Sequence, residues 1–190
     1  MQNPYKYEDH LLTERLITRF LTPDDIRVWT AFFNDKEATA YFPPLEFPTD
    51  EEKARWWIER QITRYRESRF GLQALIHKET KEFIGQCGLL IQEVDGVEEV
   101  ELAYDIFKKH WGQGYAPEAA RAFLQYAFQN NLAGSVVSII DVRNTRAQRV
   151  ASKCGMAREQ ETQWSGINVV IYRISKEKWV RDRAGLSLLQ

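Results

Sequence analysis

Residues 110–130, HWGQGYAPEAARAFLQYAFQN, combine two patterns that place a loop directly before a helix. The loop carries small residues at alternate positions, namely Gly112, Gly114 and Ala116. The helix that follows has apolar residues spaced by threes and fours, as a helix with one buried face requires: Ala119, Ala120, Phe123, Leu124, Ala127 and Phe128. Pro117 and Glu118 suit its first turn, where proline loses no hydrogen bond and an acid faces the positive end of the helix dipole.

A loop of small residues that leads into a helix leaves several backbone N–H groups unpaired, and these favour an anion such as a phosphate. A Walker A loop is excluded because the stretch lacks Gly-Lys-Ser/Thr. A dinucleotide fingerprint is excluded because Pro117 stands at the third glycine and the loop lies past the middle of the chain. The alternative to an anion site is a tight turn into an ordinary core helix.

The remaining form of phosphate loop, x-x-G-x-G/A after an apolar strand, is satisfied by Gly114-Tyr115-Ala116. With these residues the segment resembles the coenzyme A pyrophosphate loop of the GNAT superfamily of N-acetyltransferases. The motif WGQGYAPEA, residues 111–119, most resembles the RimJ/RimL branch, which acetylates ribosomal-protein N-termini. Family members have Gln or Arg three residues before the first Gly of G-x-G/A, and this chain departs from that pattern with Trp111.

Two further segments carry the same resemblance. Residues 13–16, TERL, match a familiar opening of the RimJ/RimL branch. Residues 144–156, NTRAQRVASKCGM, resemble the second hallmark of the superfamily, N-x-x-S/A followed by an ending of the form K-x-G-F/M. The two hallmarks occur in the right order and spacing, so the resemblance covers essentially the whole chain.

The composition is that of a soluble globular protein. The 190 residues are 44% hydrophobic and 28% charged, which predicts one domain, 1–190, with a full core. A net charge of -1 gives no reason to expect a nucleic-acid partner. Cys87 and Cys154 lack metal spacing and are expected to be reduced core thiols, and no metal is expected. No apolar run is long enough for a signal segment or a membrane span, so we expect no membrane partner and a cytoplasmic location.

Periodicity and turn residues predict the order of the elements. Helices are expected at 22–35, 49–68, 117–130, 144–156 and 176–184. Strands are expected from residue 16 and at 70–77, 83–94, 97–107 and 135–142, with a final hairpin within 163–175 that turns at Ser165-Gly166. Asp95-Gly96 predicts a tight hairpin turn, and Gly85 and Gly88 predict a bulge or a close backbone approach.

Two features near the N-terminal helices allow both a structural and a functional reading. The loop 41–48, YFPPLEFP, is either a packed surface loop or one wall of the acceptor groove, which this superfamily builds from its early helices. Five arginines dominate one side of the helix at 49–68 and are expected to form a solvated face, although they would also suit an acidic substrate: Arg55, Arg60, Arg64, Arg66 and Arg69.

The resemblance implies a GNAT-like α+β fold with a twisted, mostly antiparallel sheet of about seven strands and helices on both faces. In that fold the central strands, around 100–107 and 136–142, splay apart, and acetyl-CoA lies in the gap like a substitute strand. Carried over by position, Ile106 and Phe107 would pair with pantetheine, and the Ile106 N–H would bind the thioester oxygen. The amides of Trp111, Gly112, Gln113, Gly114, Tyr115 and Ala116 would bind the pyrophosphate. Asn144 would contact pantetheine, or would be a helix cap alone.

The implied reaction is direct attack of an amine on the thioester, with Glu101 as the expected general base. Alternation along the strand places Glu99, Glu101 and Asp105 on one face, and the alternative is a solvated row of acids. Other branches protonate the departing thiolate with a Tyr, but Ala151 stands at that position, so Ser152 or water would substitute. The two cysteines have no suitable partner, so a covalent intermediate is not expected.

The acceptor remains open among three readings. The branch resemblance favours a protein or peptide N-terminal α-amine, whose reference pKa of about 8 needs little help from a base, whereas that of lysine is about 10.4. The alternatives are a small-molecule amine, such as a polyamine or an amine antibiotic, and a coenzyme A sensor without transfer activity. A monomer and a homodimer are equally compatible with the sequence.

Overall fold

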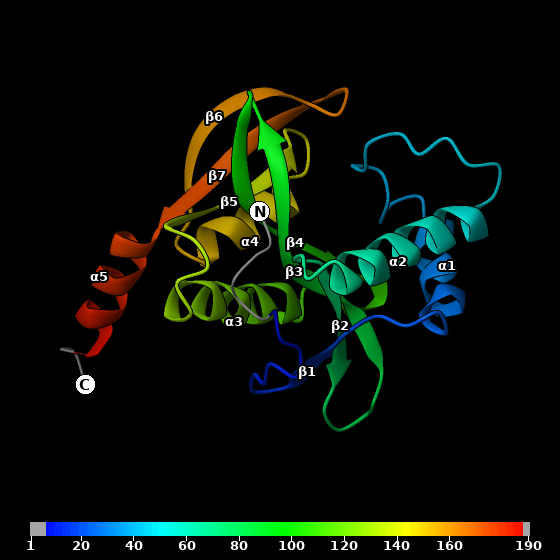
Figure 1. The fold of residues 1–190 in the computed structure, drawn as a ribbon, viewed down its shortest axis with the longest axis horizontal. Coiled ribbons are helices and arrows are strands. Elements are labelled where there is room, and N and C mark those ends of the chain that lie inside the picture. The colour runs from blue at the N-terminus through cyan, green and yellow to red at the C-terminus, as the bar shows by residue number, and fades with distance from the viewer. Residues whose placement is uncertain (1–6, 188–190) are drawn as a thin grey trace.

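The computed structural model describes residues 7–187, so the first six and last three residues of the expected domain 1–190 lie outside the described residues. A seven-stranded sheet with the order β1-β2-β3-β4-β5-β7-β6 runs through the molecule (Figure 1). Its strands are β1 (Leu16–Arg19), β2 (Leu72–His77), β3 (Phe83–Val94), β4 (Val97–Ile106), β5 (Ser135–Asp141), β6 (Ala157–Trp164) and β7 (Ile167–Ser175). The mostly antiparallel α+β architecture expected from the sequence is confirmed.

Helices cover both faces of this sheet. They are α1 (Asp25–Asn34), α2 (Asp50–Arg66), α3 (Tyr115–Gln129), α4 (Thr145–Lys153) and α5 (Lys176–Ser187), with a short 3-10 turn η1 (Lys108–His110) before α3. Helices α1 and α2 share one core cluster, in which Trp29 and Ile58 pack with Ala74 of β2. The apolar stripe of α3 enters a second cluster together with Ala151 of α4. The layers therefore place α1 and α2 on one face and α3 and α4 on the other.

Local sequence chemistry explains the turns that join these elements. Asp95 and Gly96 have φ values of 51° and 79°, and Ser165 and Gly166 have 47° and 79°, so both hairpins close with two left-handed residues as a type I′ turn requires. Thr49 begins α2 with a complete capping box, because its side chain accepts from the Glu52 N–H while the Glu52 side chain accepts from the Thr49 N–H.

The close approach expected at two glycines of β3 is confirmed. A Cβ at Gly85 would lie 2.2 Å from the carbonyl oxygen of Asp105, and one at Gly88 would lie 2.6 Å from that of Gly71. The register between β2 and β3 also shifts between Leu75 and Ile76, which is a bulge. Both glycines therefore allow neighbouring backbone to approach β3 on the strands that flank it.

Several element boundaries differ from those expected by a few residues, and two of them have a clear cause. Helix α1 begins at Asp25 rather than at residue 22. The Asp25 carboxylate accepts from the Thr22 N–H at 2.8 Å and from Arg19 at 2.7 Å, and these bonds hold the residues before the helix against its first turn. The final hairpin is longer than 163–175, since β6 already starts at Ala157. The polar, exposed residues of β6 hide this strand from a search for apolar alternation.

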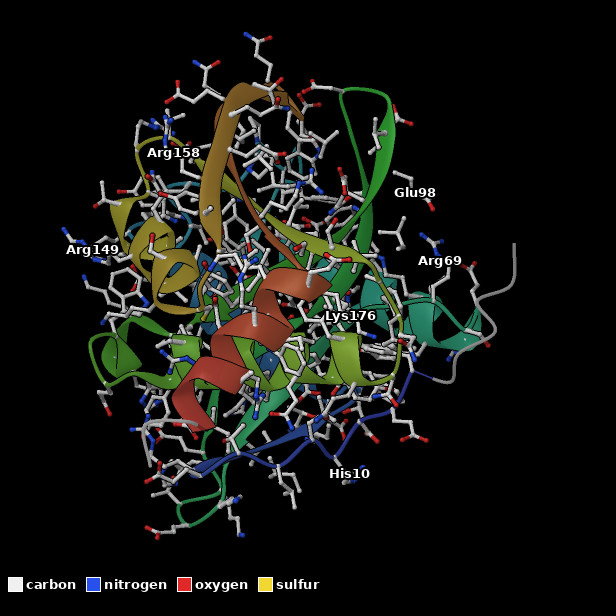
Figure 2. All side chains as sticks on the ribbon, turned by 90° about the vertical axis from the view of Figure 1, so that its left-hand side faces the viewer. His10, Arg69, Glu98, Arg149, Arg158 and Lys176 are labelled. Atoms are coloured by element: carbon white, nitrogen blue, oxygen red, sulfur yellow. The ribbon has the colours of Figure 1, made fainter. Side chains whose placement is uncertain are left out.

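The C-terminal helix closes the α3 side of the sheet. Figure 2 shows α5 lying across α3, with Lys176 at its start beside the end of β7. The ring of Trp179 on α5 packs against Phe128 of α3, with 5.5 Å between the ring centroids. This packing holds the end of α3 that lies away from the glycine loop.

The centre of the sheet contains a seam. Strands β4 and β5 are parallel and pair at one register only, Glu101 with Val137. At the start of the seam the Ser138 hydroxyl donates to the Leu102 carbonyl at 2.7 Å, and beyond it the strands diverge toward Ile106 and Asp141. The splayed central strands that the family resemblance implies are thus present.

Candidate active site

A cavity of about 830 Å³ opens at this seam. Its walls come mainly from β4, β5, the glycine loop with the start of α3, the first turns of α4, and the α2 face with residues 41–45. A few residues of α1, β2, β3 and the β6–β7 hairpin also line it. The expected groove wall at 41–48 therefore does line the cavity, through Tyr41, Phe42, Pro43, Pro44 and Leu45. Segments far apart in the sequence meet here because the sheet order brings both halves of the fold to its centre.

The glycine loop has the geometry of an anion site. Gly112 and Gly114 adopt φ values of 75° and 83°, a left-handed conformation that favours glycine. Gly114 is the N-cap of α3 and has no side chain to occupy the first N–H groups of the helix. Trp111, Gly112, Gly114, Tyr115 and Ala116 line the cavity, and Gln113 does not. The Trp111 N–H already donates to the Lys108 carbonyl at 3.0 Å, so it is not free for a phosphate as expected. The free N–H groups at the start of the helix fit a phosphate.

Arg15 and Glu118 hold this loop in place. Glu118 lies in the first turn of α3, as expected. Its carboxylate also accepts from the Thr13 hydroxyl and from the backbone N–H and side chain of Arg15. Arg15 also donates to the Gln113 carbonyl at 2.9 Å and lies 4.3 Å from the centre of the Tyr115 ring. The TERL motif at residues 13–16 was recognised in the sequence, but its contacts were not predicted. In the structure Thr13 and Arg15 anchor the glycine loop and the first turn of α3.

Trp111 and its neighbours close the end of β4. The Trp111 indole donates to the Ile106 carbonyl at 2.8 Å, and the Arg146 guanidinium stacks 4.1 Å from the Trp111 ring centre. Arg146 lines the cavity, so a cation stands close to the position where the family has Gln or Arg.

Ile106 and Phe107, the two residues expected to contact pantetheine, differ in the direction of their backbone N–H groups. The Phe107 N–H donates to the Ile84 carbonyl of β3 at 3.1 Å, and the Phe107 carbonyl accepts from His110. Since adjacent residues of a strand direct their N–H groups to opposite sides, the Ile106 N–H faces the seam. Ile106 lines the cavity and Phe107 does not. The geometry thus suits Ile106 as a donor and leaves Phe107 engaged within the chain.

Asn144 lies at the mouth of α4 and lines the cavity. Its side-chain oxygen accepts from the Ala147 N–H at 3.1 Å, so it is a helix cap. The cap uses only the oxygen of the side-chain amide, and the nitrogen is a separate donor. Capping and a ligand contact are therefore compatible in one residue.

Glu101 is buried at the seam. It is 6% exposed and lines the cavity, so a solvated row of acids on β4 is not what the structure has. Gln92 donates to its carboxylate at 2.9 Å, and the backbone of Ile139 forms a second hydrogen bond to it. Burial raises the pKa of Glu101 to about 7, against the opposing effects of these hydrogen bonds and of Arg64. Such a carboxyl group exchanges a proton near neutral pH.

Arg64 contradicts the expectation of a solvated arginine face. It is 5% exposed and lines the same cavity as Glu101, while Arg55, Arg66 and Arg69 are exposed as expected. Arg64 is seven residues after Trp57, about two helical turns, so both side chains fall on the same edge of the buried face. The spacing of seven residues from Trp57 indicates a buried position, but a charged residue is normally expected in solvent.

Ser152 is not placed to serve as the acid. It lies on the exposed side of α4, where its hydroxyl donates to the Gln148 carbonyl at 3.0 Å. It borders a separate shallow cavity next to Tyr172 rather than the seam. Ala151 is buried beneath the same helix, so neither position offers a proton to the seam cavity.

The two cysteines lie in the core, and neither belongs to a group of metal ligands among the described residues. Cys87 and Cys154 are buried, and burial raises the pKa of Cys154 to about 11, so its reactive thiolate form is scarce at neutral pH. Within residues 7–187, no three His, Cys, Asp or Glu side chains group as metal ligands would. No helix in the described part of the chain has the length and apolar character needed to cross a membrane.

This chain is similar in sequence and in fold to known proteins. The family model described as "Acetyltransferase (GNAT) domain" matches residues 15–157. The YkkB protein of Bacillus subtilis (strain 168) is 34% identical over 149 residues, which cover 77% of this chain and 84% of YkkB. The N-acetyltransferase p20 of Bacillus licheniformis is 30% identical over 150 residues, covering 78% and 83%.

The solved structures support the fold but not the RimJ/RimL branch. The structure of RimL, a ribosomal L7/L12 alpha-N-protein acetyltransferase in complex with coenzyme A, superposes with a TM-score of 0.71. It is 15% identical, and the match covers 88% of this chain and 98% of RimL. Many other acetyltransferase structures share this fold, so RimL is one neighbour among many. The family match and the two sequence relatives show that the chain belongs to the GNAT acetyltransferases, enzymes that take an acetyl group from acetyl-CoA.

Proposed function

We propose that this enzyme acetylates the N-terminal α-amine of a protein or peptide by direct attack in a ternary complex. The observation that carries the proposal is Glu101, a buried carboxyl group with a pKa of about 7 at the seam where the coenzyme is expected. An α-amine with a pKa near 8 requires about 1 kcal/mol for deprotonation at pH 7, whereas lysine requires over about 4 kcal/mol. Glu101, directly or through one water, meets the smaller demand.

The residues that line the cavity have separate roles in binding acetyl-CoA and in the transfer. Backbone N–H groups of Gly112, Gly114, Tyr115 and Ala116 bind the pyrophosphate, and Asn144 contributes its side-chain nitrogen to pantetheine. The Ile106 N–H holds the thioester oxygen and stabilises its negative charge during attack. The C–N bond forms as the C–S bond breaks, Glu101 receives the amine proton, and water protonates the leaving thiolate. With a reference pKa of about 8.5, that thiolate needs little help.

The charges that α2 contributes to the cavity favour a single amine over a polycation. Arg60 and Arg64 of α2 both line the cavity, whereas its acidic residues, Glu37, Glu101, Asp105 and Asp141, come from other parts of the chain. A polyamine or an aminoglycoside would bring several positive charges toward these guanidinium groups, and like charges repel. A small molecule with one amine remains the second candidate, since residues 41–45 and Trp57 offer it an apolar wall.

The test compares short peptides with free N-termini against the same peptides blocked at the N-terminus but carrying a lysine. We expect acetylation of the free N-termini, measured by mass spectrometry and by release of free coenzyme A. Acetyl groups found only on lysine side chains would refute the proposed acceptor. Binding of coenzyme A without release from acetyl-CoA, across peptides and a library of small amines, would instead indicate a sensor.

A further inference from the structure

Arg64 is a buried cation without an anionic partner. Its guanidinium donates to the side-chain oxygen of Gln61 at 3.0 Å, and no carboxylate of the described residues lies within ion-pair distance of it. Gln61 is itself held, because the same oxygen accepts from the Leu72 N–H at 3.0 Å. The neutral amide therefore fixes the position of the guanidinium and leaves its charge uncompensated.

Other arginines of this chain show the contrast. Arg19 binds both carboxylate oxygens of Asp25 at 2.7 Å, and Arg173 binds both oxygens of Glu99 at 2.7 and 3.0 Å. The side chains of Arg19 and Arg173 are 37% and 29% exposed, so both are less buried than Arg64. Of these three arginines, Arg64 is the most buried and is the one without a carboxylate partner. Burial lowers the pKa of Arg64 to about 10, which leaves it charged at neutral pH.

Arg64 and Glu101 line the same cavity, and neither a hydrogen bond nor an ion pair joins them. Leu90 of β3 lies opposite Glu101 in the strand register, and α2 covers the neighbouring strand β2 at Leu72. The charge of Arg64 acts on Glu101, although no hydrogen bond joins them. A ligand in this cavity therefore has both a proton acceptor and a cation among its wall residues.

Resting on the proposed function, we infer that Arg64 binds a carboxylate of the acceptor while its amine faces Glu101. One guanidinium carries one charge and two parallel N–H donors, which match a carboxylate. Phe42 and Trp57, 5.2 Å apart between ring centroids, provide an apolar wall beside this pair. The carboxylate is either the α-carboxylate of a free amino acid or the side chain of an acidic first residue of a peptide.

The first experiment measures acetylation of matched acceptors by the wild-type enzyme. One pair is phenylalanine and phenylalaninamide, and the other is the peptide amides Glu-Ala-Ala and Gln-Ala-Ala. We expect the carboxylate to raise kcat/KM at least tenfold in one pair, and the responding pair identifies the source of the carboxylate. Equal values in both pairs would overturn the inference but leave transfer to α-amines intact.

The second experiment assigns the preference to Arg64. Arg64→Gln should lower the acid-to-amide ratio of kcat/KM to about one, and Arg64→Lys should retain part of it. A structural role would lower both acceptors equally and preserve the ratio, which would contradict the inference. Arg55→Gln is the matched control, because Arg55 lies on the same helix, is exposed and pairs with Glu51 outside the cavity.

A binding measurement separates this inference from the proposed function. 3-Phenylpropionate and 3-phenylpropanamide lack an amine, so their binding to the wild-type coenzyme A complex is independent of transfer. Calorimetry should show at least tenfold tighter binding of the acid, reduced to equal binding in Arg64→Gln. Equal binding of the two compounds to the wild type, with no carboxylate preference in either acceptor pair, overturns the carboxylate site. Absence of transfer to any α-amine, with the acid still preferred, overturns only the proposed acceptor.

Discussion

Arg15 and Glu118, 103 positions apart, join the start of β1 to the first turn of α3 through a hydrogen bond of 2.7 Å between Arg15 Nε and Glu118 Oε2. The same arginine holds the Gln113 carbonyl, so one side chain fixes both the loop and the helix that follows it. The orientation of the loop N–H groups therefore depends on a residue that does not line the cavity.

Arg15→Gln should weaken acetyl-CoA binding about tenfold, because the loop loses its anchor although no ligand contact is removed. Calorimetry on the folded variant measures this effect. Arg69→Gln serves as the control: Arg69 forms an exposed ion pair with Glu67, and such pairs contribute little. Unchanged affinity in Arg15→Gln would show that the loop keeps its conformation unaided.

Gly114→Val should abolish measurable acetyl-CoA binding, because a side chain at the N-cap of α3 would obstruct an anion. The variant is also strained, since φ is 83° at this position. Gly96→Val reproduces that strain at φ 79°, in a hairpin turn where a Cβ would meet nothing within 4 Å. We expect similar losses in melting temperature for both variants and a loss of affinity only for Gly114→Val. Equal affinities would remove the loop from the coenzyme site.

Two substitutions at Asn144 separate its cap from its proposed ligand contact. Asn144→Ala should lower the free energy of unfolding by about 1 kcal/mol and also weaken coenzyme A binding. Asn144→Ser restores a capping oxygen but not the amide nitrogen, so stability should return while affinity stays low. If serine restores both quantities, Asn144 is a cap alone.

Glu101→Gln should reduce kcat/KM by about 100-fold at pH 7, because the seam loses its proton acceptor. The rate should recover partly toward pH 9, where an α-amine deprotonates unaided. Wild-type kcat/KM should rise through pH 7, in line with the pKa of Glu101. Glu98→Gln is the control on the same strand, since Glu98 is exposed and points away from the sheet (Figure 2). Identical pH profiles for wild type and Glu101→Gln would exclude Glu101 as the base.

The stability of the protein should also depend on Glu101. Its pKa is raised on folding, so between about pH 4.5 and 7 the folded state holds a proton that the unfolded state has lost, and stability falls as the pH rises. Glu101→Gln should match the wild type near pH 4 and be more stable at pH 8, by up to about 3 kcal/mol. Denaturant titrations at the two pH values measure this difference, and a variant less stable at pH 8 would contradict it.

Local patterns predicted the parts of the fold that depend on local chemistry. The glycine loop, the stripe of α3 and the turns at Asp95 and Ser165 need only neighbouring residues, and all appear where expected. The seam and the sheet followed from the family resemblance, which the family match supports.

The remaining features depend on contacts that sequence spacing does not report. The position of Glu118 in the first turn of α3 was predicted, but its partner Arg15 lies 103 residues away and local spacing gives no sign of it. Ser152 adjoins Ala151, but one step along a helix turns a side chain by about 100°, from the core toward solvent. Arg64 occupies a position that apolar spacing marks as buried, and only the cavity explains a charge there.

The single pairing between β4 and β5 has a consequence for folding cooperativity. Strands β1–β4 form one continuous ladder and β5–β7 another, and one register joins them. A ligand bound along both inner edges adds its binding free energy to the native state as a whole, and the gain grows with the logarithm of its concentration. Saturation with coenzyme should therefore slow amide hydrogen exchange in strands of both ladders, including those that never touch it.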